Sequence, residues 1–224
     1  MFSNSALKVE LKVESIEVIS LMSKWMLDPL LPELLNELGK RGYITARVKP
    51  VSTGGYNILS IEPNVVAIKG STSVLYDLVK RSLSVESSDP GVLVKVFDEV
   101  EEILKSLGND PAKGVLFYEL TAKAKLSGSR FTFGKPVKMG DSMGVELLVV
   151  PTTFVLANGD PNSTQWLHLD VKPIWSSWSS GKVYYELIFI CRDTREKLLG
   201  IVSNFNKILN DIIVAINEAL RLAS

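Results

Sequence analysis

The first forty residues change from the period of a strand to the period of a helix. From residue 7 to 14, apolar and charged residues alternate, a period of two that fits a strand with one dry and one wet face. From residue 21 to 38, apolar residues recur at intervals of three and four, which predicts a helix. Pro29 and Pro32 interrupt it, so we expect two pieces, with the last ending near Gly39.

Strand signals dominate the next part of the chain. We expect a strand at residues 43–51 and a hairpin formed by residues 57–62 and 65–69 around Pro63-Asn64. The spacing of apolar residues within 74–79 predicts a short helix, and the polar residues 84–88 predict a loop.

A second helix is predicted after Asp89-Pro90, because Asp is a favoured N-cap and Pro is tolerated in the first turn. Gly108 is placed to end it. Its acidic residues are assigned to a solvated outer face, with a partner-binding patch as the alternative. These acidic residues are Asp98, Glu99, Glu101 and Glu102.

The second half is richer in strands. Residues 115–126, 145–156, 166–174 and 183–191 all have strand character, and turn-rich segments between them allow antiparallel pairing. Apolar residues from Leu198 to Leu220 then follow intervals of three and four. They predict one continuous helix of about 28 residues, roughly 42 Å long. Asp193 and Glu196 occupy the N-cap and N3 positions of a capping box.

These elements indicate an α+β fold, with a mainly antiparallel sheet packed on one face by helices and a long amphipathic C-terminal helix. The boundary at Gly108–Pro111 separates residues 1–108 from 109–224 as two halves, or marks a turn within one continuous domain. No sequence repeat is evident, although strands followed by helices occur twice. At the level of element order, a sheet with a long C-terminal helix resembles a helix-grip or TBP-like arrangement. The resemblance includes no sequence motif, so it assigns no functional residue.

Composition narrows the function classes. Lys and Arg number 25 and Asp and Glu number 25, so the chain lacks the basic surplus of a general duplex-binding protein. The single His and single Cys are too few for a Cys/His zinc site or an internal disulfide. We therefore expect neither metal nor cofactor. The N-terminus lacks the features of a secretory signal, so we expect a cytoplasmic protein without a membrane partner.

Two glycine-containing motifs lack the neighbouring structure or spacing that their functions require. Residues 140–144 spell G-x-S-x-G, but a strand follows where a nucleophile elbow requires a helix. Residues 128–136 resemble a phosphate-binding loop, but five residues separate the glycines and Pro136 replaces the hydroxyl residue. We interpret both as turns between strands.

Residues 123–138 offer a basic hairpin with interleaved aromatic residues. Such a pattern suits single-stranded nucleic acid or another anion, whereas lysines that keep a strand edge soluble are the simpler explanation. The residues concerned are Lys123, Lys125, Arg130, Phe131, Phe133, Lys135 and Lys138.

The strand from Trp166 to Lys172 carries the only histidine. Its period of two places Trp166, His168 and Asp170 on one face, and Tyr184 and Glu186 share a face of the next strand. If the two faces coincide, His168 with Asp170 or Glu186 is a candidate acid–base pair. A polar outer sheet face explains the same pattern without chemistry.

Two further sets of residues are assigned to binding. Trp175 and Trp178 lie in a serine-rich turn, where they cover the core or anchor a subunit or partner interface. An apolar cleft between sheet and helix is expected to be lined by Phe154, Tyr185, Phe189 and Phe205. Cys191 falls on the apolar face of the strand expected at 183–191, so we expect it to be a small buried residue.

The sequence thus favours a non-enzymatic module that binds a small apolar ligand, a protein partner or a second copy of itself. Nucleic-acid or anion binding through the basic hairpin, and acid–base catalysis by His168, are the alternatives.

Overall fold

The fold is described from a computed structural model. The described residues are 10–29, 31–51, 56–59, 62–129, 133–138, 146–149, 153–155, 163–177 and 183–223.

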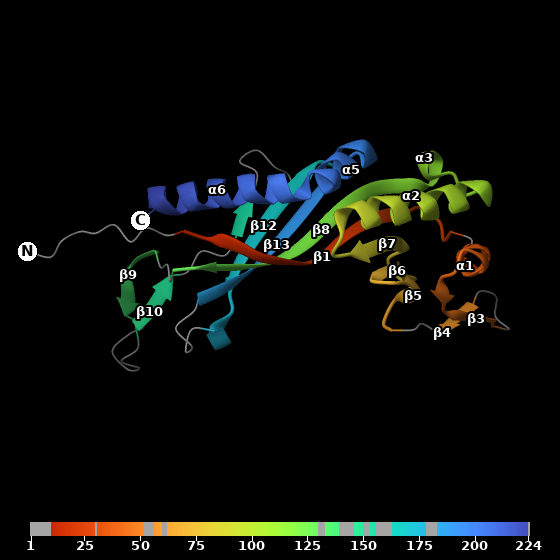
Figure 1. Cartoon of the computed structure of the whole chain (residues 1–224), viewed down its shortest axis with the longest axis horizontal. Helices are drawn as coiled ribbons and strands as arrows, with labels where there is room; N and C mark the ends of the chain where they lie inside the picture. Colours follow the sequence, from red (N-terminus) through yellow and green to blue (C-terminus); the bar gives the residue numbers. More distant parts are fainter. Residues whose placement is uncertain are drawn as a thin grey trace, which may run out of the picture.

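A nine-stranded antiparallel sheet is the centre of the molecule (Figure 1). From one edge to the other its strands are β11 (Thr153–Val155), β12 (Trp166–Pro173), β13 (Val183–Asp193), β8 (Val115–Gly128), β1 (Lys12–Trp25), β7 (Ser82–Ser87), β6 (Thr72–Asp77), β5 (Val65–Lys69) and β2 (Ile44–Thr45). Two hairpins stand apart from this sheet, β3 (Arg47–Pro50) with β4 (Tyr56–Leu59) and β9 (Phe133–Lys138) with β10 (Glu146–Val149). The helices are α1 (Leu31–Lys40), α2 (Pro90–Ser106), α3 (Pro111–Gly114), α5 (Arg195–Ser203) and α6 (Phe205–Ala223), with a 3₁₀ turn η1 at Trp175–Ser177. The predicted α+β class with a mainly antiparallel sheet is confirmed.

The strand order repeats itself about the centre of the sheet. The two central strands, β1 and β8, each have 14 residues and pair with each other. Outward from β1 lie β7, β6 and β5, and outward from β8 lie β13, β12 and β11. In both halves a helix follows the strand beside the central one, α2 after β7 and α5 after β13. The two occurrences of strands followed by helices in the sequence are therefore two copies of one topology that share a sheet.

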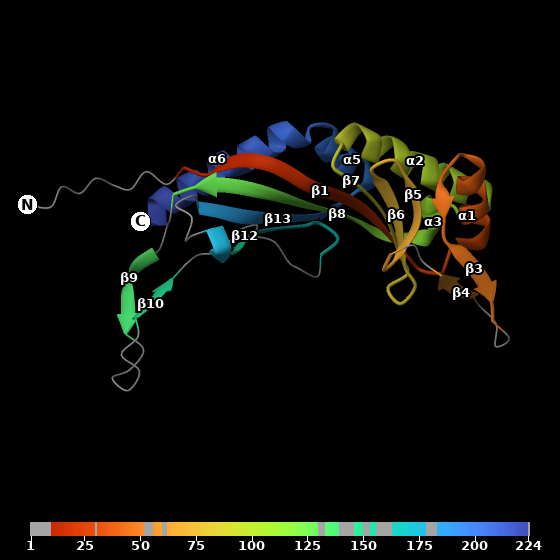
Figure 2. The ribbon, with the colours of Figure 1, turned by 60° about the horizontal axis from the view of Figure 1, so that its bottom comes forward.

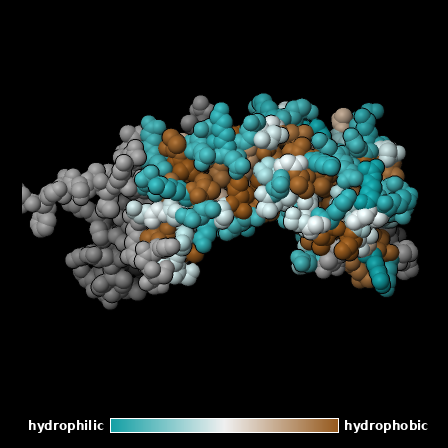
Figure 3. All heavy atoms as spheres, in the orientation of Figure 1, coloured by the Kyte–Doolittle hydropathy of each residue, from teal (hydrophilic) through white to brown (hydrophobic). Residues whose placement is uncertain are grey.

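The molecule is an arch with helices on its outer side (Figure 2). The α2, α5 and α6 helices lie over the convex face, and the β3–β4 and β9–β10 hairpins hang from opposite ends of the arch. Figure 3 shows polar and apolar side chains interspersed on the face turned to the viewer, with a hollow along the lower margin.

Burial along the strands shows which face the helices cover. In β1 the residues Ile19, Leu21, Ser23 and Trp25 are buried, whereas the residues between them are partly exposed. Since side chains alternate between the two faces of a strand, one face of the sheet packs on the helices and the other does not. Phe189 of β13 and Phe205 of α6 meet edge to face in this layer, with ring centroids 6.2 Å apart.

The α2 helix forms as its local signals predict. The Asp89 side chain accepts hydrogen bonds from the backbone N–H groups of Gly91 and Val92, at 2.8 and 3.1 Å. Gly108 follows the helix with φ of 89°, a conformation that glycine adopts without steric cost. The assignment of all four acidic residues to the solvated face is wrong for Glu101, which is only 5% exposed.

Two predicted helices in the first half are wrong. Apolar spacing predicts a helix from Leu21 to Met26, but β1 continues to Trp25 and α1 begins only at Leu31. The spacing within residues 74–79 also predicts a helix, but β6 and β7 occupy residues 72–77 and 82–87. The β7 strand includes most of the loop expected at 84–88. Burial of Thr72, Val74 and Tyr76 shows the true period of two.

The hairpin expected from residues 57–62 and 65–69 is also wrong. The β4 strand pairs with β3, and β5 pairs with β6. Only the single bridge between Glu62 and Val65 remains of the expected contact. The expected strand at 145–156 is likewise two strands, β10 and β11, which pair with different neighbours.

The C-terminal helix is divided at Asn204, contrary to the prediction of one continuous helix. The α5 helix and the long α6 helix differ in direction by 86°. Asn204 ends α5, and its side-chain amide donates to the Gly200 carbonyl at 3.0 Å. Thr194, not Asp193, is the N-cap of α5, since its hydroxyl accepts from the Lys197 backbone N–H. Among the described residues no single helix is long and apolar enough to cross a membrane; only the bent α5–α6 pair meets that test of length and composition.

Candidate functional site

The face of the sheet away from the helices, which we call the open face, gathers seven of the predicted site residues, on β8, β12 and β13. Of the residues that register and parity assign to it, Ser82 is buried and the others are partly or fully exposed. The open face consists of Val18, Ser20, Met22 and Lys24 of β1, Ser84 and Glu86 of β7, Ser73, Leu75 and Asp77 of β6, Phe117, Glu119, Thr121, Lys123 and Lys125 of β8, Tyr184, Glu186, Ile188, Ile190 and Arg192 of β13, and Trp166, His168, Asp170 and Lys172 of β12.

His168 is held by its neighbours on the open face. Its Nε2 atom lies 2.9 Å from Oδ1 of Asp170, and Oδ2 of Asp170 lies 3.1 Å from the Lys172 ammonium. The indole of Trp166 stacks on the imidazole, with centroids 5.4 Å apart and an interplanar angle of 26°. The predicted convergence of aromatic, imidazole and carboxylate groups on one strand face is therefore present.

Arg192 extends this row of side chains toward the middle of the sheet. Its guanidinium carbon lies 4.6 Å from the Phe117 ring centroid and 5.4 Å from that of Trp166. Its Nε atom donates to Glu119 at 2.5 Å. Arg192 thus connects the aromatic residues of β12 and β8 through cation–π contacts and an ion pair.

Tyr184 and Glu186 occupy a different part of the open face from His168. The Lys125 ammonium lies 4.1 Å above the Tyr184 ring, and Glu186 is opposite Lys125 and Lys172 in the sheet register. His168 is opposite Ile190, four residues along β13 from Glu186, which corresponds to about 14 Å. Of the two proposed carboxylate partners of His168, the structure places only Asp170 beside it.

Three residues that were expected to line an apolar cleft between sheet and helix are buried in the core. Tyr185, Phe189 and Phe205 are each at most 1% exposed and belong to the packed core. The Tyr185 hydroxyl donates to the Ser129 carbonyl at 2.8 Å, as expected for a buried phenol that packs in a core. These three side chains are therefore part of the core and not of a surface open to solvent, and the ligand site expected at them stays a prediction. The backbone of Phe154 lies in β11, and its side chain is outside the described part.

The remaining predicted residues are only partly described. Trp175 lies in η1 and is 62% exposed, whereas Trp178, Arg130, Phe131 and the 140–144 motif lie outside the described residues. Phe133, Lys135 and Lys138 belong to β9, of which the structure describes the backbone alone. Lys123 and Lys125 lie on the open face near the centre of the sheet, so they are part of the same surface as His168.

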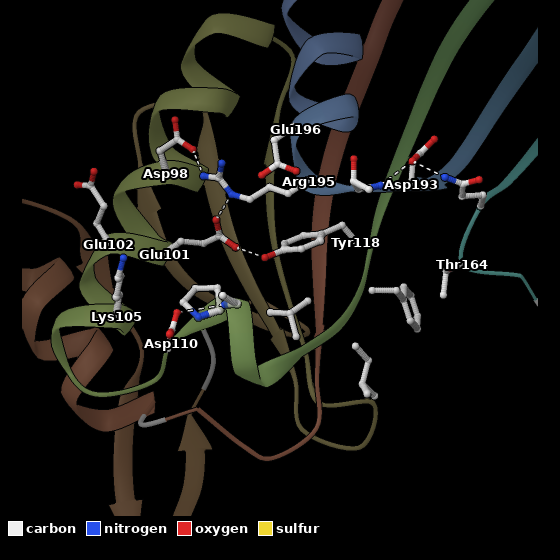
Figure 4. Close-up of a pocket in the computed structure, with 17 residues that line it drawn as sticks. Asp98, Glu101, Glu102, Lys105, Asp110, Tyr118, Thr164, Asp193, Arg195 and Glu196 are labelled. Atoms are coloured by element: carbon white, nitrogen blue, oxygen red, sulfur yellow. Dashed lines mark hydrogen bonds and ion pairs between the residues drawn. The ribbon is translucent and has the colours of Figure 1, made fainter.

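A cavity of about 800 Å³ lies elsewhere, where α2, α3, the start of β8 and the β13–α5 junction meet (Figure 4). Arg195 reaches from the start of α5 to two carboxylates of α2, with its Nε atom 2.5 Å from Glu101 and its Nη2 atom 2.5 Å from Asp98. The Tyr118 hydroxyl donates to Glu101 from β8 at 3.0 Å. This network joins the helix of the first half to the strand and helix of the second.

Burial dominates the electrostatics of this network. Desolvation raises the pKa of Glu101 above its ordinary value, although the hydrogen bonds and charge of Arg195 oppose the shift. Burial also raises the pKa of Tyr118, and the neighbouring Glu101 charge adds to it. Desolvation works to lower the pKa of Arg195, but Glu101 and Asp98 outweigh it and raise the value. Tyr118 therefore stays a protonated donor and Arg195 stays charged.

Sequence reasoning missed this network. One available signal was the position of Glu101, which lies four residues after Phe97 and three before Leu104, on the buried side of α2. Tyr118 and Arg195 carried no comparable signal, because their contacts with Glu101 join positions 17 and 94 residues apart.

Neither a known family nor a curated protein matches the chain. Within the described residues, no three His, Cys, Asp or Glu side chains are grouped so that they could hold a metal ion. Cys191 is buried, and desolvation raises the pKa of its thiol to about 11, which leaves it protonated at neutral pH.

Proposed function

We propose that the protein is a non-enzymatic binding module that holds a protein partner on the open face of its sheet. The observation that carries this proposal is the one-sided packing of the sheet. The open face keeps Trp166, Phe117, Tyr184, Ile188 and Ile190 only partly buried, although side chains of this size contribute most when desolvated.

The charges of the open face favour protein over nucleic acid. Its basic residues are Lys24, Lys123, Lys125, Lys172 and Arg192, and its acidic residues are Asp77, Glu86, Glu119, Asp170 and Glu186. Five charges of each sign leave no surplus to neutralise phosphates. Two of the ion pairs are Asp170–Lys172 within β12 and Glu119–Arg192 between β8 and β13. Aromatic residues and Arg interleaved with balanced polar groups are typical of protein interfaces.

Site-specific photo-crosslinking tests this proposal. A benzophenone amino acid at Thr121, in the middle of the open face, is compared with the same amino acid at Val214, which is 66% exposed on α6. In cells that produce the protein naturally, we expect one protein adduct from position 121 and none from position 214. Combining Trp166→Ala with Arg192→Ala should abolish the adduct, because Arg192 is diagonal to Thr121 on the adjacent strand β13 and Trp166 is opposite Arg192 on β12.

Other outcomes contradict the proposal. Adducts that disappear with nuclease and weaken steeply with salt would establish the nucleic-acid alternative instead. Equal crosslinking at positions 121 and 214, or none at either, would mean that the open face holds no protein partner.

Acid–base catalysis is a second candidate, favoured by the 2.9 Å contact between His168 and Asp170. A carboxylate that orients an imidazole prepares it to accept a proton. Hydrolysis of p-nitrophenyl acetate or p-nitrophenyl phosphate that is lost in His168→Gln and kept in Lys197→Gln would support this candidate. Background rates in all three proteins would exclude hydrolysis of these esters.

A further inference from the structure

Exposed apolar side chains cluster at one end of the sheet, where β1, β6, β7 and β8 begin or end. They are Met26 (46% exposed), Leu27 (77%), Leu78 (47%), Val79 (93%) and Leu116 (52%), and we call them the end patch. Val79 and Leu27 are the two most exposed large apolar residues in the described part of the chain. Contiguous exposed apolar surface marks interaction sites in soluble proteins.

Backbone contacts bring the segments of the end patch together. The Trp25 N–H donates to the Arg81 carbonyl at 2.9 Å, and the Arg81 guanidinium donates to the Met26 carbonyl at 2.7 Å. The Met26 N–H donates to the Gly114 carbonyl at 2.9 Å. The four strand ends are neighbours in the sheet, so the patch extends over about 14 Å.

The acidic cavity adjoins the end patch, and Leu116 belongs to both. The cavity is lined by the acids Asp98, Glu101, Glu102, Asp110, Asp193 and Glu196 against the bases Lys105 and Arg195. The positive charge of Arg195 is already paired with the carboxylates of Asp98 and Glu101. Among the described residues, Glu102 and Glu196 have no hydrogen-bond or ion-pair partner, and both are exposed. A chain without net charge therefore has a strongly negative cavity beside an apolar surface.

We infer that the end patch and the cavity together dock a segment of a partner protein that carries apolar side chains next to Lys or Arg. The apolar side chains would cover Leu27, Val79 and Leu116, and a cationic side chain would enter the cavity near Glu196 and Glu102. Charge complementarity selects this occupant, because carboxylates repel the phosphates of nucleic acids and anionic lipids. The surface is separate from the centre of the open face, so the inference does not depend on the proposed function; the two surfaces share only Phe117.

Selection from a random library of displayed 16-residue peptides, with the full-length protein as bait, tests the inference. We expect enriched peptides that combine Leu, Ile, Val or Phe with Lys or Arg at close spacing. A synthetic copy of one such peptide should bind at least tenfold more weakly to Leu116→Asp and to Glu196→Lys. The matched substitution Val214→Asp, on α6, should leave its affinity unchanged.

The variants separate a folding defect from a lost contact. Leu116 and Glu196 are exposed, so thermal unfolding followed by circular dichroism should match that of the wild-type protein. Enriched peptides without cationic residues, or affinities that neither variant changes, would overturn the inference. A dimer in sedimentation equilibrium that Leu116→Asp converts to a monomer would also overturn it, because a second copy would then cover the patch. Loss of the Thr121 adduct alone would contradict the proposed function and leave this inference intact.

Discussion

Replacing Arg195 with Met should destabilise the protein through an unpaired buried charge. Glu101 has a side chain only 6% exposed, and Arg195 is its cationic partner at 2.5 Å. Met preserves much of the aliphatic length of Arg but removes the guanidinium, so Glu101 would keep only the hydrogen bond from Tyr118. The substitution isolates the electrostatic role of one residue that joins the two halves of the molecule.

The expected magnitude follows from the burial of each group. Removing one partner of a buried ion pair costs about 3–5 kcal/mol. Arg195 is 30% exposed and Asp98 is 41% exposed, so solvent screens part of the network and the lower value applies. A loss of about 3 kcal/mol corresponds to a decrease in Tm of about 6–12 °C for a chain of this length.

The cost should depend on pH. A carboxyl whose pKa is raised by folding stabilises the folded state while protonated, and that contribution is lost as pH rises through the folded-state value. Without Arg195 the pKa of Glu101 rises further, because burial is no longer opposed by a positive charge. The difference between wild type and variant is therefore largest at neutral pH and decreases toward pH 4.5, the ordinary value for Glu. Adding Glu101→Gln should recover part of the lost stability at neutral pH.

Urea unfolding at pH 7 and pH 5, followed by circular dichroism, measures these differences. Lys40→Met is a matched control that removes one charge from the exposed Lys40–Glu37 pair and should cost at most about 0.5 kcal/mol. An Arg195→Met protein within about 1 kcal/mol of wild type at pH 7, with the same difference at pH 5, would refute the role assigned to Glu101.

Further predictions test other contacts and buried groups of the fold. Asn217 accepts from the Leu11 N–H at 2.8 Å and donates to its carbonyl at 3.1 Å, so Asn217→Ala should cost about 2 kcal/mol and speed amide exchange at Leu11. A methyl group at Gly114 would lie 2.8 Å from Cζ3 of Trp25, so Gly114→Ala should destabilise by about 1–3 kcal/mol in urea unfolding. Phe205→Ala should cost about 3–5 kcal/mol, since the ring is buried against Phe189. The Cys191 thiol, with a pKa of about 11, should react with Ellman's reagent at pH 8 far more slowly than glutathione does, and reaction at an equal rate would contradict its burial.

The sequence predicts an element well where its start, its apolar period and its end are all marked by nearby residues. In α2 the N-cap Asp89, the following Pro90, the period of apolar residues and the terminal Gly108 all agree. The long strands β8, β12 and β13 likewise have clear alternation between turn-rich segments. In these elements, contacts within a few residues of the chain favour the same conformation as the tertiary structure does.

Elements with two competing periods could not be predicted from the chain alone. Val74, Leu75, Leu78 and Val79 have helical spacing, yet Thr72, Val74 and Tyr76 share a strand face. Pairing with β5 and β7 decides in favour of the strand, and this pairing is not visible in the local sequence. The break between α5 and α6 at Asn204 could not be predicted for a similar reason. The spacing of apolar residues continues across Asn204, and neither Pro nor Gly marks the break.

The same distinction separates the predictable part of the site from the part that was missed. Trp166, His168 and Asp170 alternate along one strand, so parity alone places them on one face, and their mutual contacts required no further information. The neighbouring Arg192 and Phe117 required the register of two strand pairs, β12 with β13 and β13 with β8. Glu101 required more, since its charge is compatible with burial only when Arg195, 94 residues away, reaches it. A buried carboxylate on an otherwise apolar helix face therefore implies a distant cationic partner, and it is the feature of such a sequence from which a long-range contact can be inferred.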